Sequence, residues 1–385
     1  MGSGIFTQNG AAWKHSRALL RPQFASNRFQ NFREIQKYVE NLISQIPANG
    51  IVDLQPLFFQ LTFNTTTFLL FGEKISPLDN IAGQELEFSR AFDLGQEYLS
   101  HRGRLGHFYW LSNPPEFRRA CELTHQFVEQ AIQKALEAAD SNTDSAKRYV
   151  FIDALIQETR NKKELRDQCL NVLLAGRDTT ACCLTWTLRL LARHPRVLDK
   201  LRREIELISG LGSRATLPTQ EHLKKMQYLH LVLKEVLRLY PSVPVNSREA
   251  LKTTVLPLGG GSDGQSPILI RKGEAVGYCV YAMHRRKDLY GHDALEFRPE
   301  RWEDPNLLQN IGYGYLPFNG GPRACLGQEF ALLEAGYTVA RIIQRYPMIT
   351  TLPNDPVMEI GKEKQRLTLV VAAGDGCWVQ LLDRT

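Results

Sequence analysis

Apolar residues recur at helical spacing through most of this 385-residue chain. Where they stand three or four positions apart, one face of a helix is apolar and packs against a core. Pro22 and Pro241 end two of these patterns, because proline lacks the N–H group that a helix interior needs. The spacing predicts helices over residues 10–21, 30–46, 54–71, 84–99, 114–139, 163–193, 195–208 and 221–240, and one that begins just after Cys325.

The pattern over 163–193 is apolar on nearly every side and therefore predicts a helix that runs through the interior. Its middle nevertheless reads Ala-Gly-Arg-Asp-Thr-Thr from Ala175 to Thr180. Gly176 costs about 1 kcal/mol relative to alanine in a helix, and a buried acid and two hydroxyl groups cost more unless they are satisfied. Packing gives no reason for these residues, so we expect an opening in the helix that faces a ligand. The alternative is a kinked helix whose polar groups bond back to the backbone.

Strand patterns are fewer and shorter. Residues 243–279 combine proline, glycine and β-branched residues at strand spacing. Residues 367–372 and 377–382, around a Gly-Asp-Gly turn, predict a terminal hairpin. The predicted fold class is therefore mainly α with smaller β-sheets (α+β). Nothing in the composition suggests repeats or disorder, so we expect residues 1–385 to form a single domain.

Composition narrows the function classes. The net charge is +6 and the pI is about 8.9, but no basic run with interleaved aromatic residues stands out, which argues against nucleic acid. The positive charge better suits an acidic protein partner or a membrane surface. The seven cysteines form no regular framework, so we expect reduced thiols facing the cytosol. No apolar run reaches the roughly 20 residues of a membrane span.

The most informative stretch is a glycine- and proline-bearing loop that ends in Cys325. A cysteine at the start of a helix lies near free N–H groups and the positive end of the helix dipole, which predicts a lowered thiol pKa and a metal-binding thiolate. Gly320, Gly321 and Gly327 let the backbone approach a large flat group, and Arg323 adds a positive charge suited to a carboxylate. The alternative is a buried structural cysteine in a tight loop.

Two further pairs stand at helical spacing. Trp13 and Arg17 are four residues apart and share a helix face, which on its own indicates an ordinary amphipathic helix. Glu235 and Arg238 are three apart, a spacing that is usually a solvated surface ion pair. Apolar neighbours on both sides of Glu235 and Arg238 favour burial instead.

These patterns resemble the motifs of the cytochrome P450 superfamily. Its haem-binding loop, Phe-x-x-Gly-x-Arg-x-Cys-x-Gly, is matched at every fixed position by Phe318, Gly321, Arg323, Cys325 and Gly327. Four more motifs precede it in the family's order: Trp-x-x-x-Arg, Ala-Gly-x-Asp-Thr, Glu-x-x-Arg and Pro-Glu-Arg-Trp. The resemblance extends over nearly the whole chain and implies the cytochrome P450 fold, a helix-rich lobe with a β-rich lobe.

The resemblance also implies a role for each motif. The loop and Trp-x-x-x-Arg would bind haem, with a cysteine thiolate as the axial ligand of the iron, and the acid and threonine would deliver protons on the distal face. Glu-x-x-Arg and the arginine of Pro-Glu-Arg-Trp would form a buried network that fixes the haem loop. The implied residues are Trp13, Arg17, Phe318, Gly321, Arg323, Cys325 and Gly327 for cofactor binding, Cys325 for the metal, Asp178 and Thr179 for catalysis, and Glu235, Arg238 and Arg301 for the network.

The implied activity is that of a haem-thiolate monooxygenase, which inserts one atom of dioxygen into a C–H bond. Residues 91–97, 104–106 and 109–111 are similar to the fungal branch that oxidises alkanes and fatty acids at or near the chain end. The aromatic residues in those stretches are equally consistent with ordinary core packing. An isomerase or dehydratase on the same scaffold, which uses no dioxygen, is an alternative, but the intact Asp178-Thr179 pair argues against it.

The resemblance implies that electrons come from NADPH indirectly, through NADPH–cytochrome P450 reductase, with cytochrome b5 as a second donor. For a full-length member it implies the cytosolic face of the endoplasmic reticulum membrane. The match begins at the family's third helix, so we expect the membrane anchor, first helices and first strands to be missing. The remaining strands would then expose a sheet edge, and an inactive haem-binding fragment becomes a further alternative.

Overall fold

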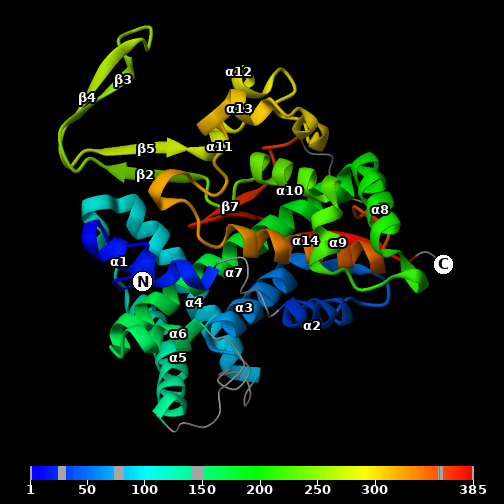
Figure 1. Ribbon diagram of the computed structural model, residues 1–385, viewed down its shortest axis with the longest axis horizontal. Helices are drawn as coiled ribbons and strands as arrows, with labels where there is room; N and C mark the ends of the chain where they lie inside the picture. Colours follow the sequence, from blue (N-terminus) through cyan, green and yellow to red (C-terminus); the bar gives the residue numbers. More distant parts are fainter. Residues whose placement is uncertain are drawn as a thin grey trace.

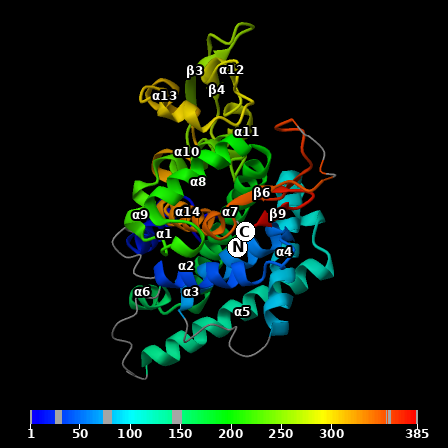
Figure 2. The same cartoon turned by 90° about the vertical axis from the view of Figure 1, so that its right-hand side faces the viewer.

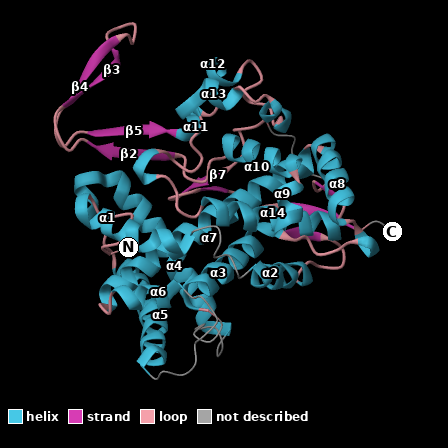
Figure 3. Cartoon of the chain, viewed as in Figure 1, coloured by secondary structure: helices cyan, strands magenta, loops and turns pink. Residues whose placement is uncertain are grey.

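The computed structural model describes residues 2–24, 32–72, 82–140, 151–353, 355 and 359–383. It confirms the predicted fold class, because helices dominate and four small sheets lie among them (Figures 1 and 3). The helices are α1 Gly10–Leu20, α2 Phe32–Ser44, α3 Leu54–Phe71, α4 Ala82–Leu105, α5 Pro115–Asp140, α6 Phe151–Glu158, α7 Lys162–Arg193, α8 Pro195–Ser209, α9 Gln220–Lys225, α10 Gln227–Leu239, α11 Val280–Met283, α12 Lys287–Tyr290, α13 Leu307–Ile311 and α14 Gln328–Arg345. No helix within these described ranges is long and apolar enough to cross a bilayer.

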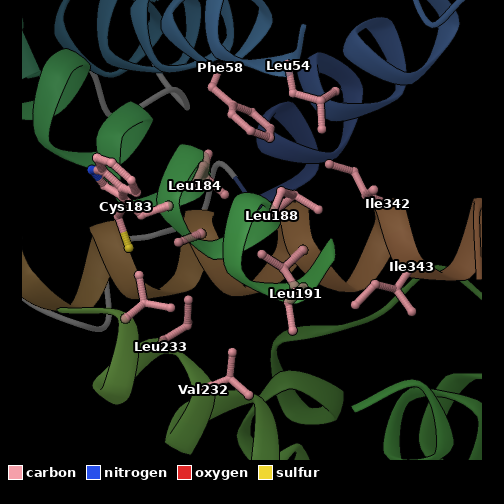
Figure 4. Close-up of a cluster of buried hydrophobic side chains, with 14 of the residues drawn as sticks. Leu54, Phe58, Cys183, Leu184, Leu188, Leu191, Val232, Leu233, Ile342 and Ile343 are labelled. Carbon is pink, nitrogen blue, oxygen red and sulfur yellow. The ribbon is translucent and has the colours of Figure 1, made fainter. Parts of the chain in front are cut away.

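Helix α7 is the axis of the core, as its apolar pattern predicts. Its leucines, including Leu184, Leu188 and Leu191, are fully buried. Figure 4 shows them between Phe58 of α3, Val232 and Leu233 of α10, and Ile342 and Ile343 of α14. Asn161 caps the N-terminus of α7 by accepting hydrogen bonds from the N–H groups of Lys163 and Glu164. Helices α3, α10 and α14 thus bury one continuous apolar surface around α7.

Gly176 in the middle of α7 has a packing reason that the sequence does not reveal. A Cβ atom at this position would lie 2.5 Å from Oγ1 of Thr66 on α3 and 2.9 Å from its methyl carbon. Helices α3 and α7 therefore approach each other here more closely than any larger residue would permit. The expectation that packing gives no reason for Gly176 is wrong.

The pattern over 221–240 predicts one helix, but the structure has two, α9 and α10, with Met226 between them. The cause lies on α8. Both carboxylate oxygens of Glu204 accept hydrogen bonds from the start of α10, at 2.7 Å from the N–H of Tyr228 and 2.9 Å from that of Leu229. A carboxylate from another helix therefore caps α10 and fixes a new N-terminus in the middle of the apolar pattern.

Nine short strands form the sheets. β1 Ile51–Asp53, β9 Trp378–Leu382 and β6 Met348–Thr350 make an antiparallel three-stranded sheet with β9 in the centre. The other three sheets are antiparallel pairs. They join β2 Val245–Glu249 to β5 Ala275–Cys279, β3 Thr254–Gly260 to β4 Ser266–Ile270, and β7 Gln365–Leu367 to β8 Val371–Ala373.

The predicted terminal hairpin over 367–382 is wrong in its pairing, because β8 pairs with β7 and β9 pairs with β1 and β6. The carboxylate of Asp53 accepts a hydrogen bond from the N–H of Cys377 at 2.7 Å. A Cβ on Gly376, where φ is 82°, would lie 2.5 Å from that carboxylate. The Gly-Asp-Gly turn thus directs the chain towards β1 instead of back along β8.

The β3–β4 hairpin projects from the body of the molecule in two perpendicular views (Figures 1 and 2). Its apolar side chains are largely exposed, with Val255 at 55%, Leu258 at 59% and Leu269 at 56%. Among the described residues, this hairpin and the β2–β5 pair are each two-stranded sheets.

The close approach at Gly176 predicts the effect of adding one methyl group. We expect Gly176→Ala to lower the free energy of unfolding by about 1–3 kcal/mol, because the overpacking cost exceeds the gain in helix propensity. Thr66→Ala in the same chain removes both clashing atoms and should restore most of the loss. Gly95→Ala on α4, where a Cβ would meet nothing within 4 Å, is the matched control and should not destabilise the chain. Denaturant unfolding of the parent and the three variants measures this, and equal effects at positions 176 and 95 would contradict the close approach of α3 and α7 as the cause.

Candidate active site around Cys325

The loop before α14 is a tight turn that presents Cys325. The N–H of Cys325 donates to the carbonyl of Phe318 at 2.9 Å, which closes the turn. Asn319 and Gly321 have φ angles of 62° and 67°. The strained conformation at Asn319 is held by its own side chain, whose oxygen accepts from the Gly320 N–H and the Tyr278 hydroxyl, each at 2.9 Å. The backbone of the loop is therefore fixed by bonds that leave the cysteine side chain unused.

Cys325 precedes Gly327, the N-cap of α14, as the sequence predicts. The predicted lowering of its thiol pKa is wrong for the protein alone. Cys325 is exposed at the surface of the protein, yet atoms around its thiol exclude part of the water, and this desolvation raises the pKa of Cys325, although the backbone of Gly327 and the positive charge of Arg17 act in the opposite direction. A coordinating metal deprotonates a thiol outright. The loop thus holds a thiol ready for a metal, and the metal itself would complete its ionisation.

Helix α1 brings the Trp-x-x-x-Arg pair to this loop from the other end of the chain. Nη1 of Arg17 donates to the carbonyl of Ala324 at 3.0 Å. The guanidinium of Arg323 lies 4.5 Å from the ring centre of Trp13, and that of Arg17 lies 5.8 Å from it. Arg323 also donates to the carbonyl of Gln8 and the side chain of Asn9, each at 3.0 Å. The structure therefore gathers Trp13, Arg17 and Arg323 beside the cysteine.

A cavity of about 590 Å³ opens at this junction, and both Arg17 and Cys325 line it. Phe24 and Leu326 add apolar surface, Arg21 adds a second guanidinium, and Glu329 adds a carboxylate. Within the described ranges, no three His, Cys, Asp or Glu side chains gather as a protein-bound metal would require. A lone thiol with arginines and an indole nearby suits a metal carried in its own macrocycle with acidic substituents. The donor set therefore fits haem.

The polar residues of α7 divide between two faces of the helix. Ala175, Gly176 and Thr179 are half-exposed, whereas the residues around them are buried. The hydroxyl of Thr179 donates to the carbonyl of Ala175 at 2.6 Å, as the kinked-helix alternative expects. Its carbonyl accepts from the hydroxyl of Ser242 at 2.8 Å. Thr179 thus lies on a half-exposed face of a continuous helix, and its own hydrogen bonds are made.

Asp178 lies on the buried face of α7. Of Asp178 and Thr179, only Thr179 is therefore half-exposed. The carboxylate of Asp178 accepts from Nη1 of Arg177 at 3.2 Å, and the same nitrogen lies 2.5 Å from the carboxylate of Asp93 on α4. Burial raises the pKa of Asp178 to about 6, although Arg177 lowers it. Among the described residues no hydrogen bond or ion pair joins Asp178 or Thr179 to the Cys325 group. The sequence reasoning missed Arg177 and Asp93, although an arginine in a buried helix signals a partner of opposite charge.

Glu235, Arg238 and Arg301 form one buried network. Arg238 binds both oxygens of Glu235, at 2.8 and 2.9 Å, and Nε of Arg301 donates to the same carboxylate at 2.8 Å. Two donors escaped the sequence reasoning: the indole of Trp302 at 2.9 Å and the backbone N–H of Arg298 at 3.0 Å. Trp302 follows Arg301 directly, so its place in the motif was the available signal. The side chains of Glu235 and Arg238 are both 0% exposed, so this is no surface ion pair.

The network predicts a large cost for removing its centre. We expect Glu235→Ala to lower the free energy of unfolding by roughly 3–5 kcal/mol, because buried Arg238 loses its carboxylate partner and Arg301 keeps only Asp293. Glu300→Ala is the control, since Glu300 adjoins Arg301 but pairs with Lys200 at a partly exposed site, and should cost about 1 kcal/mol or less. Denaturant unfolding of the full chain measures both. Similar losses of unfolding free energy in the two variants would show that the buried Glu235 carboxylate stabilises the fold no more than a surface ion pair does.

Asp178 predicts an unusual dependence of stability on pH. Its pKa is 3.8 in an unfolded chain and about 6 here, so the folded state binds more protons between these values. The free energy of unfolding therefore falls as pH rises through this window. Asp178→Asn removes this titrating group and its contribution to the free energy of unfolding. We expect the variant to be more stable than the parent at pH 7 by up to about 3 kcal/mol. The advantage should shrink towards pH 4. Thermal unfolding at both pH values tests this, and a difference that does not change with pH would contradict it.

Comparison with known proteins places the chain in a family. The family model described as cytochrome P450 matches residues 1–370. A protein named Cytochrome P450 from Arthroderma benhamiae is 62% identical over 390 residues, which cover 99% of this chain and 77% of that protein. Cytochrome P450 52A5 of Candida maltosa is 44% identical, with coverage of 99% and 74%. Cytochrome P450 52A6 of Candida tropicalis is 43% identical, with coverage of 99% and 75%. With the Cys325 loop and its surroundings, these matches establish that the chain belongs to the cytochrome P450 family.

Proposed function

We propose that this cytochrome P450 monooxygenase hydroxylates a long-chain alkane or fatty acid at or near the end of the chain. As a member of the family it is an oxidoreductase with a haem-thiolate cofactor, and it receives electrons from NADPH through a reductase. The observation that carries the reaction class is that Cys325 and Arg17 line one cavity, while Arg323 of the same loop lies beside Trp13. Haem, when bound there, supplies the activation of dioxygen.

The residues of the chain have separate tasks in this proposal. Cys325 would hold the haem iron through its thiolate, which donates electron density to the metal. Arg17 and Arg323 would bind the haem carboxylates by charge-assisted hydrogen bonds, and Trp13 would donate its indole N–H to the same region. Phe318, Gly321 and Gly327 shape the loop that presents the ligand. Each of these tasks uses a side chain or turn that already lies at the cavity or in the loop.

Proton delivery belongs to α7. Thr179 stands at the half-exposed face and Asp178 lies one residue before it with a pKa raised by burial to about 6. An acid with a pKa near neutral pH both gives and regains a proton readily, which is what a general acid requires. Thr179 gives up its bond to Ala175 when it passes a proton onward. The exposed carboxylate of Asp93, bound to Arg177, connects this buried acid to the surface of α4.

The substrate class rests on the fungal-branch resemblance over 91–97, 104–106 and 109–111. These residues fall into two groups, one buried and one exposed. Phe92 is buried and stacks on Phe88 at 5.5 Å, which is the core packing named as the alternative. Tyr109 and Trp110 are 50% and 61% exposed, so core packing does not explain them. The proposal therefore draws on the second group and on the relatives that carry the name Cytochrome P450 52.

The partners follow from the same proposal. NADPH–cytochrome P450 reductase supplies the electrons, and cytochrome b5 is a second donor. Arg21, which lines the Cys325 cavity near the surface, gives that side a positive charge that suits an acidic electron donor. We place the enzyme on the cytosolic face of the endoplasmic reticulum membrane.

The reduced, carbon-monoxide-bound absorption spectrum tests the cofactor, and turnover with reductase, NADPH and long-chain fatty acids tests the substrate. We expect a strongly red-shifted Soret band and products hydroxylated near the chain end. Cys325→Ala should abolish that band, because no thiolate remains. Cys279→Ala should leave it unchanged, since Cys279 is also exposed but lies on β5. A parent chain without the band would overturn the haem-thiolate proposal, and a parent with the band that turns over no alkane or fatty acid would overturn the substrate class.

A further inference from the structure

His284 connects the Glu235 network to the segment that leads into the Cys325 loop, and no motif pointed to it. The residue follows α11 and is fully buried. Its Nδ1 lies 3.1 Å from the carbonyl oxygen of Arg238. On the other side of the ring, the N–H of Leu316 donates to Nε2 at 2.8 Å. A carbonyl only accepts and a backbone N–H only donates, so the ring is neutral with its proton on Nδ1.

The bond to Leu316 reaches the base of the cysteine loop. The carbonyl of Leu316 accepts from the N–H of Asn319 at 3.2 Å, and the carbonyl of Phe318 accepts from the N–H of Cys325 at 2.9 Å. A short series of backbone bonds therefore runs from the imidazole to the residue that carries the thiol. The position of Leu316 sets where this turn begins.

The other side of His284 is anchored just as firmly. Nη1 of Arg238 donates to the carbonyl of His284 at 2.8 Å, so the two residues exchange bonds in both directions. The imidazole stacks on Tyr315 with ring centres 5.2 Å apart, and the hydroxyl of Tyr315 donates to the carbonyl of Lys234 on α10 at 3.1 Å. The ring can neither rotate nor withdraw without breaking contacts on both faces.

We propose that His284 is a positioning residue that carries the fixed geometry of the Glu235–Arg238–Arg301 network to the Cys325 loop and holds the thiolate in its ligand position. This inference rests on the proposed haem-thiolate function, and it adds a residue through which the network acts. It explains how a network that has no hydrogen bond or ion pair to Cys325, within the part of the chain that the structure describes, can constrain the ligand. The constraint passes through one imidazole and one backbone N–H.

The charge state of the ring supports this role. Burial, helped by the nearby guanidinium groups of Arg238 and Arg285, lowers the pKa of His284 to about 4. The imidazole is therefore neutral at physiological pH, and Nε2 stays free of a proton and able to accept from Leu316. A protonated ring would present N–H to N–H at this contact and would break it.

Two amide variants separate the two bonds. An asparagine amide reaches about as far as Nδ1, so His284→Asn keeps a donor for Arg238 and loses the acceptor for Leu316. A glutamine amide reaches about as far as Nε2, so His284→Gln keeps the acceptor for Leu316. His230→Asn is the control, because His230 lies on α10, is half-buried, and its ring contacts the carbonyl of Leu223 away from the loop.

Two measurements on the full chain decide the proposal. The first is the reduced, carbon-monoxide-bound spectrum of the haem-loaded protein, where we expect His284→Asn to move a large fraction of the Soret band from the thiolate position to that of a neutral ligand. His284→Gln and His230→Asn should keep the thiolate band. The second is hydrogen exchange of the Leu316 amide in haem-free protein. We expect its protection to fall about tenfold in His284→Asn, as the loss of one buried hydrogen bond predicts.

Each outcome bears on the proposal in one direction. An Asn variant with the parent's band and the parent's protection at Leu316 overturns it. If the Asn variant does not fold, the Gln variant decides: retention of the thiolate band supports the proposal, and its loss in a folded protein overturns it. A parent chain without a thiolate band would contradict the proposed function, and the exchange measurement would then still test the contact between His284 and the loop.

Discussion

The segment that leads into the Cys325 loop depends on one group, the carboxylate of Glu235. It accepts hydrogen bonds from Arg238, Arg301, Trp302 and the backbone of Arg298, and it is entirely buried. A buried charge is tolerable only when every partner is in place. The helix α10 and the segment around Trp302 must therefore adopt one relative position. Arg238 also donates hydrogen bonds to the carbonyls of Ala294 and His284. These bonds fix the irregular segment that precedes the cysteine loop.

Much of this arrangement was predictable from sequence, because its signals are local. The cysteine loop, the long apolar helix and the position of the cysteine before a helix N-terminus all depend on neighbouring residues. The errors share a different origin. Thr66 explains Gly176, Glu204 divides the helix at Met226, and Asp53 diverts the last strand. In each case a residue distant in sequence decides a local conformation, and no pattern around the affected position records its presence.

The pKa shifts of Cys325 and Asp178 also depend on residues that are distant in sequence. The helix N-terminus correctly located Cys325, but the sequence could not reveal how closely other atoms would crowd the thiol, and crowding raises its pKa. The acid of α7 was identified by its motif, yet its environment depends on α4. One nitrogen of Arg177 lies within reach of both Asp178 and Asp93, so the two carboxylates share a single positive charge. The ionisation of the buried acid is thus tied to the position of a neighbouring helix.

The central place of β9 in its sheet has a consequence for the order of folding. β9 is the last strand of the chain, yet it separates β1 from β6 and supplies the hydrogen bonds of both. Asp53 and Cys377, which lock this junction, are 324 residues apart. During synthesis on the ribosome, β1 emerges well before β9 and must wait for this partner until β9 has been made. The β1–β9–β6 sheet therefore forms late in folding, because its formation closes a long loop. Until then, the helices packed around α7 must keep the chain compact.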